Sequence, residues 1–258
     1  MSGPPPAGRL GAARRGRRAF EAEGIVVEVG RRCRAVHRAD GGGPVVATLD
    51  DGRSVSGDEI LVAVGRRPNT ADLGIERFGL EPGRYLPVDE RLLVKGVEGE
   101  WLYAIGDCNG LALLTHMGKY QGRIAADVIL GKQITDVADA GIVPRVTFTD
   151  PQVAAVGPTE AQAREQGIRV RTVSHGTGDV AGASTQGNGI KGTSHLVIDE
   201  DRRVIVGATF TGPAVQELLH AATVAIAGQV PLDVLWHAVP SFPTVSEVWL
   251  RLLETYGL

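Results

Sequence analysis

An acidic residue, Asp107, stands in this sequence where its carboxylate could bind a ligand that carries several hydroxyl groups. It follows the apolar residues 101–105 and then Gly106. The apolar run predicts a buried strand, and a glycine at its end lets a ligand approach the backbone without meeting a side chain. A carboxylate accepts hydrogen bonds from several donors at once, as the hydroxyls of a ribose or ribityl chain require. Gly-Asp is also an ordinary turn dipeptide, so a purely structural turn is the alternative.

A second apolar run ends at a glycine in the same way. Residues 59–64 are followed by Gly65, two arginines and a proline. The run predicts a strand, and Gly65 either allows close packing of the backbone or simply ends that strand. Arg66 and Arg67 could reach a phosphate, although paired arginines on a connecting loop are usually solvated.

Near the C-terminus, residues 242–247 read Phe-Pro-Thr-Val-Ser-Glu. Together, the segments 62–69, 103–107 and 242–247 resemble the pyridine nucleotide-disulfide oxidoreductases, which are flavoenzymes with two dinucleotide-binding sites. The resemblance extends from about residue 20 to the C-terminus. It implies an α/β fold, in which part of the Rossmann-like FAD- and NAD(P)-binding layers precedes an α+β dimerisation domain that forms a homodimer. It also implies that electrons pass from NAD(P)H through FAD to a small-molecule acceptor, which the sequence does not name.

The resemblance assigns cofactor contacts to individual residues. It implies that Asp107 accepts a hydrogen bond from a ribityl hydroxyl of FAD, while Gly106 and Gly65 allow close packing. The helix predicted over residues 113–130 would begin against the flavin ring, because exposed N–H groups at a helix start favour anionic or carbonyl oxygens. The candidate contacts at that helix start are Leu114, Thr115 and His116.

The C-terminal segment departs from the family pattern at the catalytic base. In disulfide-reducing members, a His-Pro-Thr-x-x-Glu stretch supplies a histidine base that the glutamate holds. Phe242 occupies the histidine position here, and phenylalanine cannot move a proton. Glu247 is the remaining catalytic candidate, and His237 is interpreted as structural, with a rescue role as the alternative. A metal ion, a quinone or oxygen is therefore open as the electron acceptor in place of a disulfide.

Two features of the family are absent from the sequence. No Gly-x-Gly-x-x-Gly follows an apolar strand near its start, and the glycines of residues 182–192 lie in the predicted dimerisation domain. There is no Cys-x-x-x-x-Cys redox pair, since Cys33 and Cys108 are the only cysteines. We therefore expect the C-terminal half of a longer enzyme, which by itself binds FAD weakly or not at all. The alternative is a non-catalytic dimerisation module or a truncated remnant.

The sequence divides into three parts. Residues 1–19 are rich in proline, glycine and arginine and predict a disordered basic tail, with binding to RNA or a membrane as the alternative. Residues 20–142 predict the C-terminal remainder of the NAD(P)- and FAD-binding domains, and residues 143–258 predict the dimerisation domain. Apolar patterns predict strands at residues 25–29, 33–37, 45–49, 54–64, 101–105, 145–148, 170–174, 195–199 and 204–211. They predict helices at residues 113–130, at 159–166 and in two stretches after residue 211.

Composition narrows the classes of partner. At 258 residues with 43% hydrophobic content, the chain can bury a core. Its net charge of −3 provides no bulk attraction to nucleic acid or to an acidic membrane, so we expect a small-molecule partner. The two cysteines form neither a redox pair nor a metal-binding cluster, so no metal site is expected. No apolar run approaches the about 18 residues that span a bilayer and no apolar signal core begins the sequence, which predicts a cytoplasmic protein.

Overall fold

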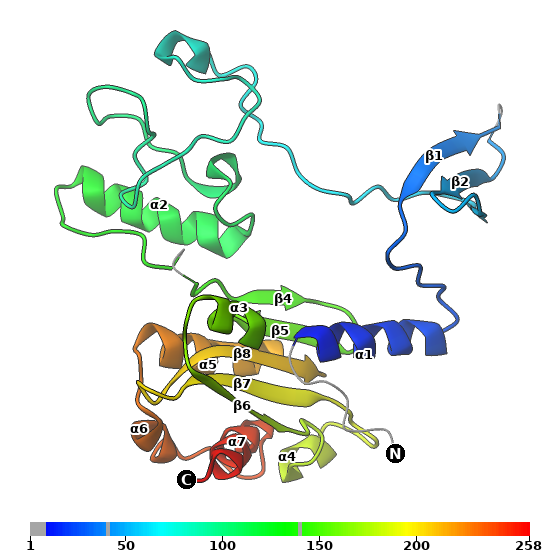
Figure 1. Ribbon diagram of the computed structural model, residues 1–258, viewed down its shortest axis with the longest axis vertical. Coiled ribbons are helices and arrows are strands. Elements are labelled where there is room, and N and C mark those ends of the chain that lie inside the picture. Colours follow the sequence, from blue (N-terminus) through cyan, green and yellow to red (C-terminus); the bar gives the residue numbers. More distant parts are fainter. Residues whose placement is uncertain (1–8, 40–41, 139–140) are drawn as a thin grey trace. The chain divides into compact units, whose positions relative to one another are not determined.

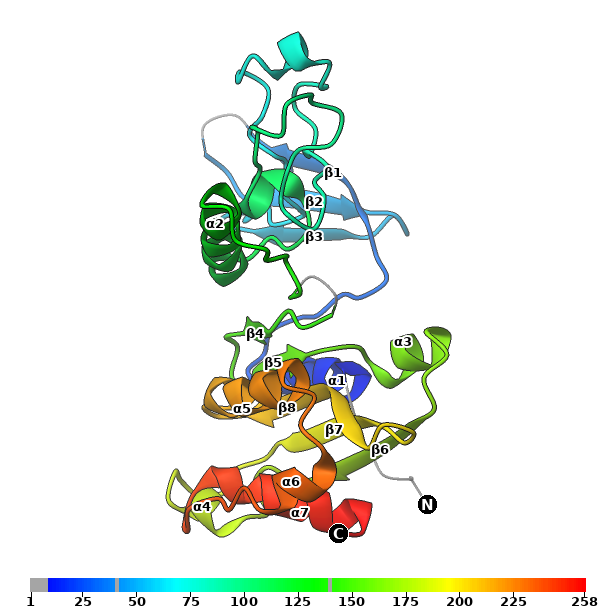
Figure 2. The same cartoon turned by 90° about the vertical axis from the view of Figure 1, so that its left-hand side faces the viewer.

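The computed structural model describes residues 9–39, 42–138 and 141–258. The chain divides into two units, Phe20–Arg67 and Met1–Ala19 with Pro68–Leu258. Each unit contains one antiparallel sheet, and Figures 1 and 2 show that helices accompany the sheet of the larger unit. The predicted mixed α/β class is therefore confirmed. No helix within the described ranges has the length and apolar character needed to cross a lipid bilayer.

The smaller unit is built on three strands in the order β1-β2-β3. These are β1 (Cys33–Arg38), β2 (Val45–Leu49) and β3 (Ser54–Gly57). Gly52, with a φ of 85°, lies in the hairpin turn between β2 and β3, where a left-handed backbone favours glycine. Ala47 of β2 lies opposite both Val36 and Val55, so the central strand is paired on its two edges.

Two apolar runs of the smaller unit do not form the strands that their sequences predict. Residues 25–29 are irregular, and the chain leaves the sheet after β3, so residues 59–64 are irregular as well. Leu61 and Val64 are 91% and 93% exposed. An apolar run becomes a strand only where a neighbouring strand pairs with its backbone groups, and no strand in the described residues pairs with these runs. Both predictions of a strand were therefore wrong for this chain.

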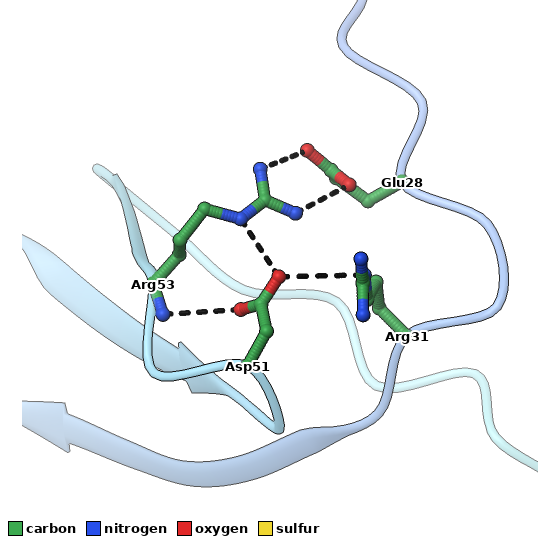
Figure 3. Close-up of polar contacts among 4 residues, drawn as sticks. All are labelled: Glu28, Arg31, Asp51 and Arg53. Carbon is green, nitrogen blue, oxygen red and sulfur yellow. Dashed lines mark hydrogen bonds and ion pairs between the residues drawn. The ribbon is translucent and has the colours of Figure 1, made fainter.

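Four charged side chains connect the segment before β1 to the β2–β3 hairpin (Figure 3). The Arg53 guanidinium donates to both carboxylate oxygens of Glu28, over 2.8 and 2.9 Å. Its Nε donates to Asp51 Oδ2 over 2.8 Å, and Arg31 Nε lies 3.3 Å from the same oxygen. The alternation of charges holds residues 28–31 against the hairpin turn.

We expect acid to loosen this four-residue network. Hydrogen bonds from Arg53 lower the pKa of both Glu28 and Asp51 below their ordinary values. Because the folded-state pKa values are lowered, the stability they contribute is present above the ordinary pKa and is lost as pH falls through the folded-state pKa. A carboxyl ¹³C NMR titration should place both pKa values below those in the Arg53→Gln variant. Equal values in the two proteins would contradict the assignment.

The larger unit contains a five-stranded antiparallel sheet in the order β4-β5-β8-β7-β6. Its strands are β4 (Arg145–Thr147), β5 (Gln152–Val156), β6 (Val170–His175), β7 (Thr193–Asp199) and β8 (Val204–Gly212). Four of them lie where the apolar pattern predicts strands, whereas β5 was missed. Helix α3 (Glu160–Glu165) follows β5 and begins at a capping box, in which Thr159 and Gln162 satisfy each other's backbone N–H groups.

The core of this sheet is covered by α5 (Gln216–Ala227) and α7 (Val248–Tyr256). Each of these helices buries one apolar face, because its apolar residues recur every three or four positions. The short α4 (Ala181–Ser184), α6 (Leu232–Trp236) and η3 (Val245–Glu247) complete this region. The largest fully buried side chain among the described residues is Phe210 of β8.

Residues 68–138 form little regular structure apart from one long helix. The elements are η1 (Ile75–Phe78), η2 (Gly106–Asn109) and α2 (Thr115–Ile129). Helix α2 confirms the helix predicted over residues 113–130. The strand predicted at residues 101–105 was wrong, since only Tyr103 forms a β-bridge, with Leu93. The segment is too short for a ladder because it turns into η2 at Gly106.

Residues 9–22 form helix α1 (Arg9–Ala22), which corrects the prediction of a disordered tail over residues 1–19. Arginine, alanine and leucine are strong helix formers, and the proline-rich stretch lies before this helix. Residues 1–8 lie outside the described residues.

Candidate functional site

The turn that carries Asp107 is fixed to helix α2 by a buried amide. Gln121 of α2 is completely buried, and its Oε1 accepts from the Gly106 backbone N–H over 2.7 Å. The same oxygen accepts from Asn109 Nδ2 over 2.9 Å, and that amide also donates to the Ala104 carbonyl over 3.1 Å. A buried amide with satisfied hydrogen bonds holds a defined geometry. Gln121 and Asn109 thus set the position of η2, although neither was a candidate from the sequence.

Two glycines allow the turn and the helix to approach closely. Gly106 has a φ of 71°, in the left-handed region that favours glycine. A Cβ on Gly118 would lie 3.2 Å from the Gly106 Cα, which is tighter than ordinary packing. Gly106 is predicted from the sequence to allow close approach of a ligand, and in the structure it also allows close approach of α2.

Asp107 itself is exposed within this fixed turn. Its backbone carbonyl accepts from Gly110 N over 3.2 Å, which closes η2. The backbone of Asp107 is therefore held in the turn, and the residue remains exposed. An exposed carboxylate on a fixed turn can accept hydrogen bonds from ligand hydroxyls.

The start of helix α2 lies in the same region of the chain. Leu114 is the N-cap, and no side chain caps the helix there. Leu114 is half-buried, whereas Thr115 and His116 are exposed. Uncapped N–H groups and the helix dipole favour partial negative charge at such a position. His116 Nε2 lies 2.9 Å from the Pro144 carbonyl, so this nitrogen must carry the proton and donate it.

Gly65 belongs to the smaller unit, at a φ of 149°, and a Cβ there would meet no atom within 4 Å. Its assignment to close packing near the cofactor stays a prediction. Arg66 and Arg67 are exposed beside it, as expected for a connecting loop.

The C-terminal segment presents an exposed phenylalanine and a buried carboxylate. Phe242 is 76% exposed, and Glu247 is only 8% exposed. Arg251 Nη2 donates to Glu247 Oε1 over 2.7 Å, and the Ala181 N–H donates to Oε2 over 3.3 Å. Each oxygen of Glu247 thus has a partner that joins η3 to α4 and α7. This arrangement favours a structural role for Glu247, and the signal that was missed in the sequence is an arginine four residues later on a helix.

His237 is exposed at the end of α6. Its backbone N–H donates to the Val234 carbonyl over 3.1 Å, as in an ordinary helix end. Within the described residues, no group of three or more His, Cys, Asp or Glu side chains could hold a metal ion.

The residues of the larger unit fit one side of a flavin site. Asp107 provides an acceptor for hydroxyl groups, and the uncapped start of α2 provides donors and positive potential for a polar ring edge. A glycine-rich turn that could cradle a pyrophosphate is absent from this region of the sequence. Asp107 and the start of α2 therefore fit the ribityl chain and the ring of the cofactor.

Comparison with known proteins decides the family. The sequence model described as "Pyridine nucleotide-disulphide oxidoreductase" matches residues 10–126. The one described as "Pyridine nucleotide-disulphide oxidoreductase, dimerisation domain" matches residues 143–252. The chain belongs to the pyridine nucleotide-disulphide oxidoreductase family. The resemblance stated from residues 62–69, 103–107 and 242–247 is thereby confirmed.

Individual relatives agree with this assignment. The chain is 33% identical to a dihydrolipoyl dehydrogenase of Thermus scotoductus, over 96% of this chain and 54% of the relative. It is 30% identical to one from Haloferax volcanii, over 92% of this chain and 50% of the relative. The chain thus spans about half the length of the curated relatives it matches.

Solved structures share the fold. A crystal structure of LpdA from Mycobacterium tuberculosis matches with a TM-score of 0.83 at 27% identity, over 96% of this chain and 53% of that one. A Cu(II) complex of the flavoprotein disulfide reductase RclA from Escherichia coli matches with a TM-score of 0.79 at 24% identity, over 92% and 53%. The second likeness concerns the fold alone.

Proposed function

We propose that this chain forms part of a flavin-dependent oxidoreductase that passes electrons from NAD(P)H through FAD to a small-molecule acceptor. The observation that carries the proposal is Asp107, an exposed carboxylate on a turn fixed by Gln121. Family membership supports both cofactors. We further propose residues 20–142 as the C-terminal remainder of the nucleotide-binding domains and residues 143–258 as the dimerisation domain.

Each candidate residue would serve the cofactor in a different way. Asp107 would accept from ribityl hydroxyls, and Gly106 would keep the turn clear of side chains. The start of α2 at Leu114, Thr115 and His116 would present N–H groups and positive potential to the ring edge. Gly65 would serve close packing where the chain crosses between domains. When bound, FAD itself supplies the capacity to accept a hydride from NAD(P)H and to hand electrons on.

The chemistry of the acceptor is constrained by Phe242 and Glu247. Phenylalanine cannot hold or move a proton, and both oxygens of Glu247 are hydrogen-bonded to Arg251 and Ala181. We therefore propose a non-disulfide acceptor, such as a metal ion, a quinone or oxygen.

We also propose that the protein works as a homodimer through residues 143–258. The matched dimerisation domain supports this, as do exposed apolar side chains in α6 and in the segment between α6 and η3. Val234, Val239 and Phe242 are 54%, 86% and 76% exposed, and exposed apolar clusters mark interaction sites. A cytoplasmic location belongs to the same proposal, supported by two cysteines that form no disulfide.

A second candidate function is a non-catalytic dimerisation module. The observation that favours it is the absence of glycine-rich dinucleotide loops from the first part of the sequence. Light scattering and absorption spectroscopy on the purified chain distinguish the dimerisation module from the enzyme. A dimer that gains no flavin band when mixed with FAD supports the module for this chain, whereas a yellow protein supports the enzyme.

The proposed function is tested in a fusion protein. The part of the Thermus scotoductus relative that this chain does not match is joined in front of residue 10, to supply the glycine-rich loops and the redox cysteine pair that the family resemblance implies. The purified fusion should be yellow, and NAD(P)H added without oxygen should bleach its flavin band. A folded, dimeric fusion that stays colourless with added FAD would refute the proposed function.

Restoring a base at position 242 should raise disulfide reduction. In the fusion, Phe242→His places an imidazole where disulfide-reducing members carry one, and general base catalysis is worth about 10²–10⁴-fold. We expect reduction of lipoamide to rise by about 10²-fold at the lower end of that range. Phe242→Tyr is the control, because a phenol retains the aromatic ring without a base near neutral pH. If lipoamide reduction rises equally in both variants, the absence of a base at position 242 does not limit this activity.

A further inference from the structure

A cavity of about 450 Å³ lies beside the β4–β5–β8 end of the large sheet, apart from the residues proposed for FAD. Its walls within residues 142–229 combine basic, amide and apolar side chains. Arg145 extends from β4 and Arg202 from the turn between β7 and β8, while Gln162 lies in α3 and Gln166 is its C-cap. Ile168 and Ile205 contribute apolar wall. The volume is within the range of small-molecule sites, which is about 300–1,000 Å³.

The polar groups of this cavity are hydrogen-bond donors with positive charge. Arg145 forms no ion pair with an acidic residue of the described chain. Arg202 has only a long contact of 4.0 Å with Asp199, whose Oδ1 already accepts two backbone N–H groups of the turn. Among the residues that the structure describes, no aspartate or glutamate lines the cavity. Two guanidinium groups without a close carboxylate favour an anionic ligand.

Gln162 adds a donor whose orientation is fixed. Its Oε1 accepts from the Thr159 backbone N–H over 2.9 Å and from the Thr159 hydroxyl over 3.0 Å. With the oxygen held in this capping box, the amide can offer only its NH₂ group to the cavity. The Thr-x-x-Gln spacing therefore begins helix α3 and also fixes the orientation of the Gln162 amide.

We propose that this cavity binds a small amphiphilic anion, with its carboxylate between Arg145 and Arg202 and its apolar body against Ile168 and Ile205. The apolar wall distinguishes such a ligand from an inorganic anion, because burial of a hydrocarbon body adds to the charge-assisted hydrogen bonds. None of the residues proposed for FAD lines the cavity, although Leu111, which lies between Asp107 and Leu114 in the sequence, does. The proposal does not depend on the proposed function.

Calorimetric titration of the purified 258-residue chain with octanoate tests the proposal. Octanoate should bind saturably at one site per chain, and inorganic phosphate and 1-octanol should each bind at least about tenfold more weakly, equivalent to about 1.4 kcal/mol. Arg145→Gln and Arg202→Gln should each weaken octanoate binding by at least about tenfold. Arg164→Gln, which removes an arginine from α3 outside the cavity, should leave binding unchanged.

Two further measurements locate the ligand and check that the variants are folded. The side-chain NH₂ signals of Gln162 and Gln166 should shift in NMR spectra on addition of octanoate, and circular dichroism should show that the arginine variants remain folded. The proposal is overturned if no saturable binding occurs, if 1-octanol or phosphate matches octanoate, or if both arginine variants bind like the original protein. None of these outcomes bears on flavin binding.

Discussion

Replacing Phe210 by alanine should lower the free energy of unfolding of the larger unit by about 3–5 kcal/mol. Phe210 lies in β8, the middle strand of the sheet, and is completely buried. Its ring centroid lies 5.6 Å from that of Trp249 on α7, so the side chain joins the sheet to the last helix. Truncation would leave a cavity that fixed backbones on two sides cannot close. Urea unfolding followed by tryptophan fluorescence measures the change.

Phe148→Ala is the matched control for this prediction. Phe148 follows β4 in the same domain but is 76% exposed, so its loss should change the free energy of unfolding by less than about 0.5 kcal/mol. Similar losses in the two variants would show that the sheet core is not packed as described.

Gly182→Ala should both destabilise the larger unit and displace the C-terminal motif. A Cβ on Gly182 would lie 2.0 Å from the Thr244 carbonyl carbon and 2.4 Å from its Cα. These are backbone atoms, and the chain just beyond them is held because Glu247 is bonded to Ala181 and Arg251. We expect a loss of about 3 kcal/mol, at the top of the usual range for overpacked cores. Chemical unfolding measures the loss, and sedimentation velocity measures the expected weakening of the proposed dimer.

Gly122→Ala provides the comparison for that variant. Gly122 lies inside α2, where a Cβ would meet only the Ile105 side chain at 3.5 Å, an ordinary contact. Alanine in a helix interior is favoured over glycine by about 1 kcal/mol. Gly122→Ala should therefore be neutral or stabilising. A Gly182→Ala protein as stable and as dimeric as this control would contradict the close packing of α4 on residue 244.

The sequence predicts the large sheet and its helices well because their apolar spacing and their pairing agree. The patterns behind α2, α5 and α7 recur at helical spacing and become buried faces. The runs at residues 25–29, 59–64 and 101–105 have the same local character as true strands. These runs do not form strands because a strand also needs a partner strand, and the sequence of the run does not show whether a partner is present. Helix α1 was missed because its composition was interpreted as that of a tail.

The candidate site was predictable in part. Asp107 and Gly106 could be found because the Gly-Asp pair follows an apolar run and recurs in a known family pattern. Gln121 and Asn109 could not, since their role depends on two elements packed together, although a glutamine within the apolar stripe of α2 is the available signal. Glu247 was the remaining catalytic candidate, and its observed partners are Arg251 and Ala181.

The central claim is that Asp107 forms part of a flavin site, and an FAD titration of the fusion protein tests it most directly. The fusion should bind about one FAD per chain, and Asp107→Ala should weaken binding by at least about tenfold, as expected for loss of a charge-assisted hydrogen bond. Asp72→Ala, which removes another exposed carboxylate from residues 68–138, should bind FAD as the unaltered fusion does. Equal FAD affinity in the Asp107→Ala and Asp72→Ala fusions would contradict the account.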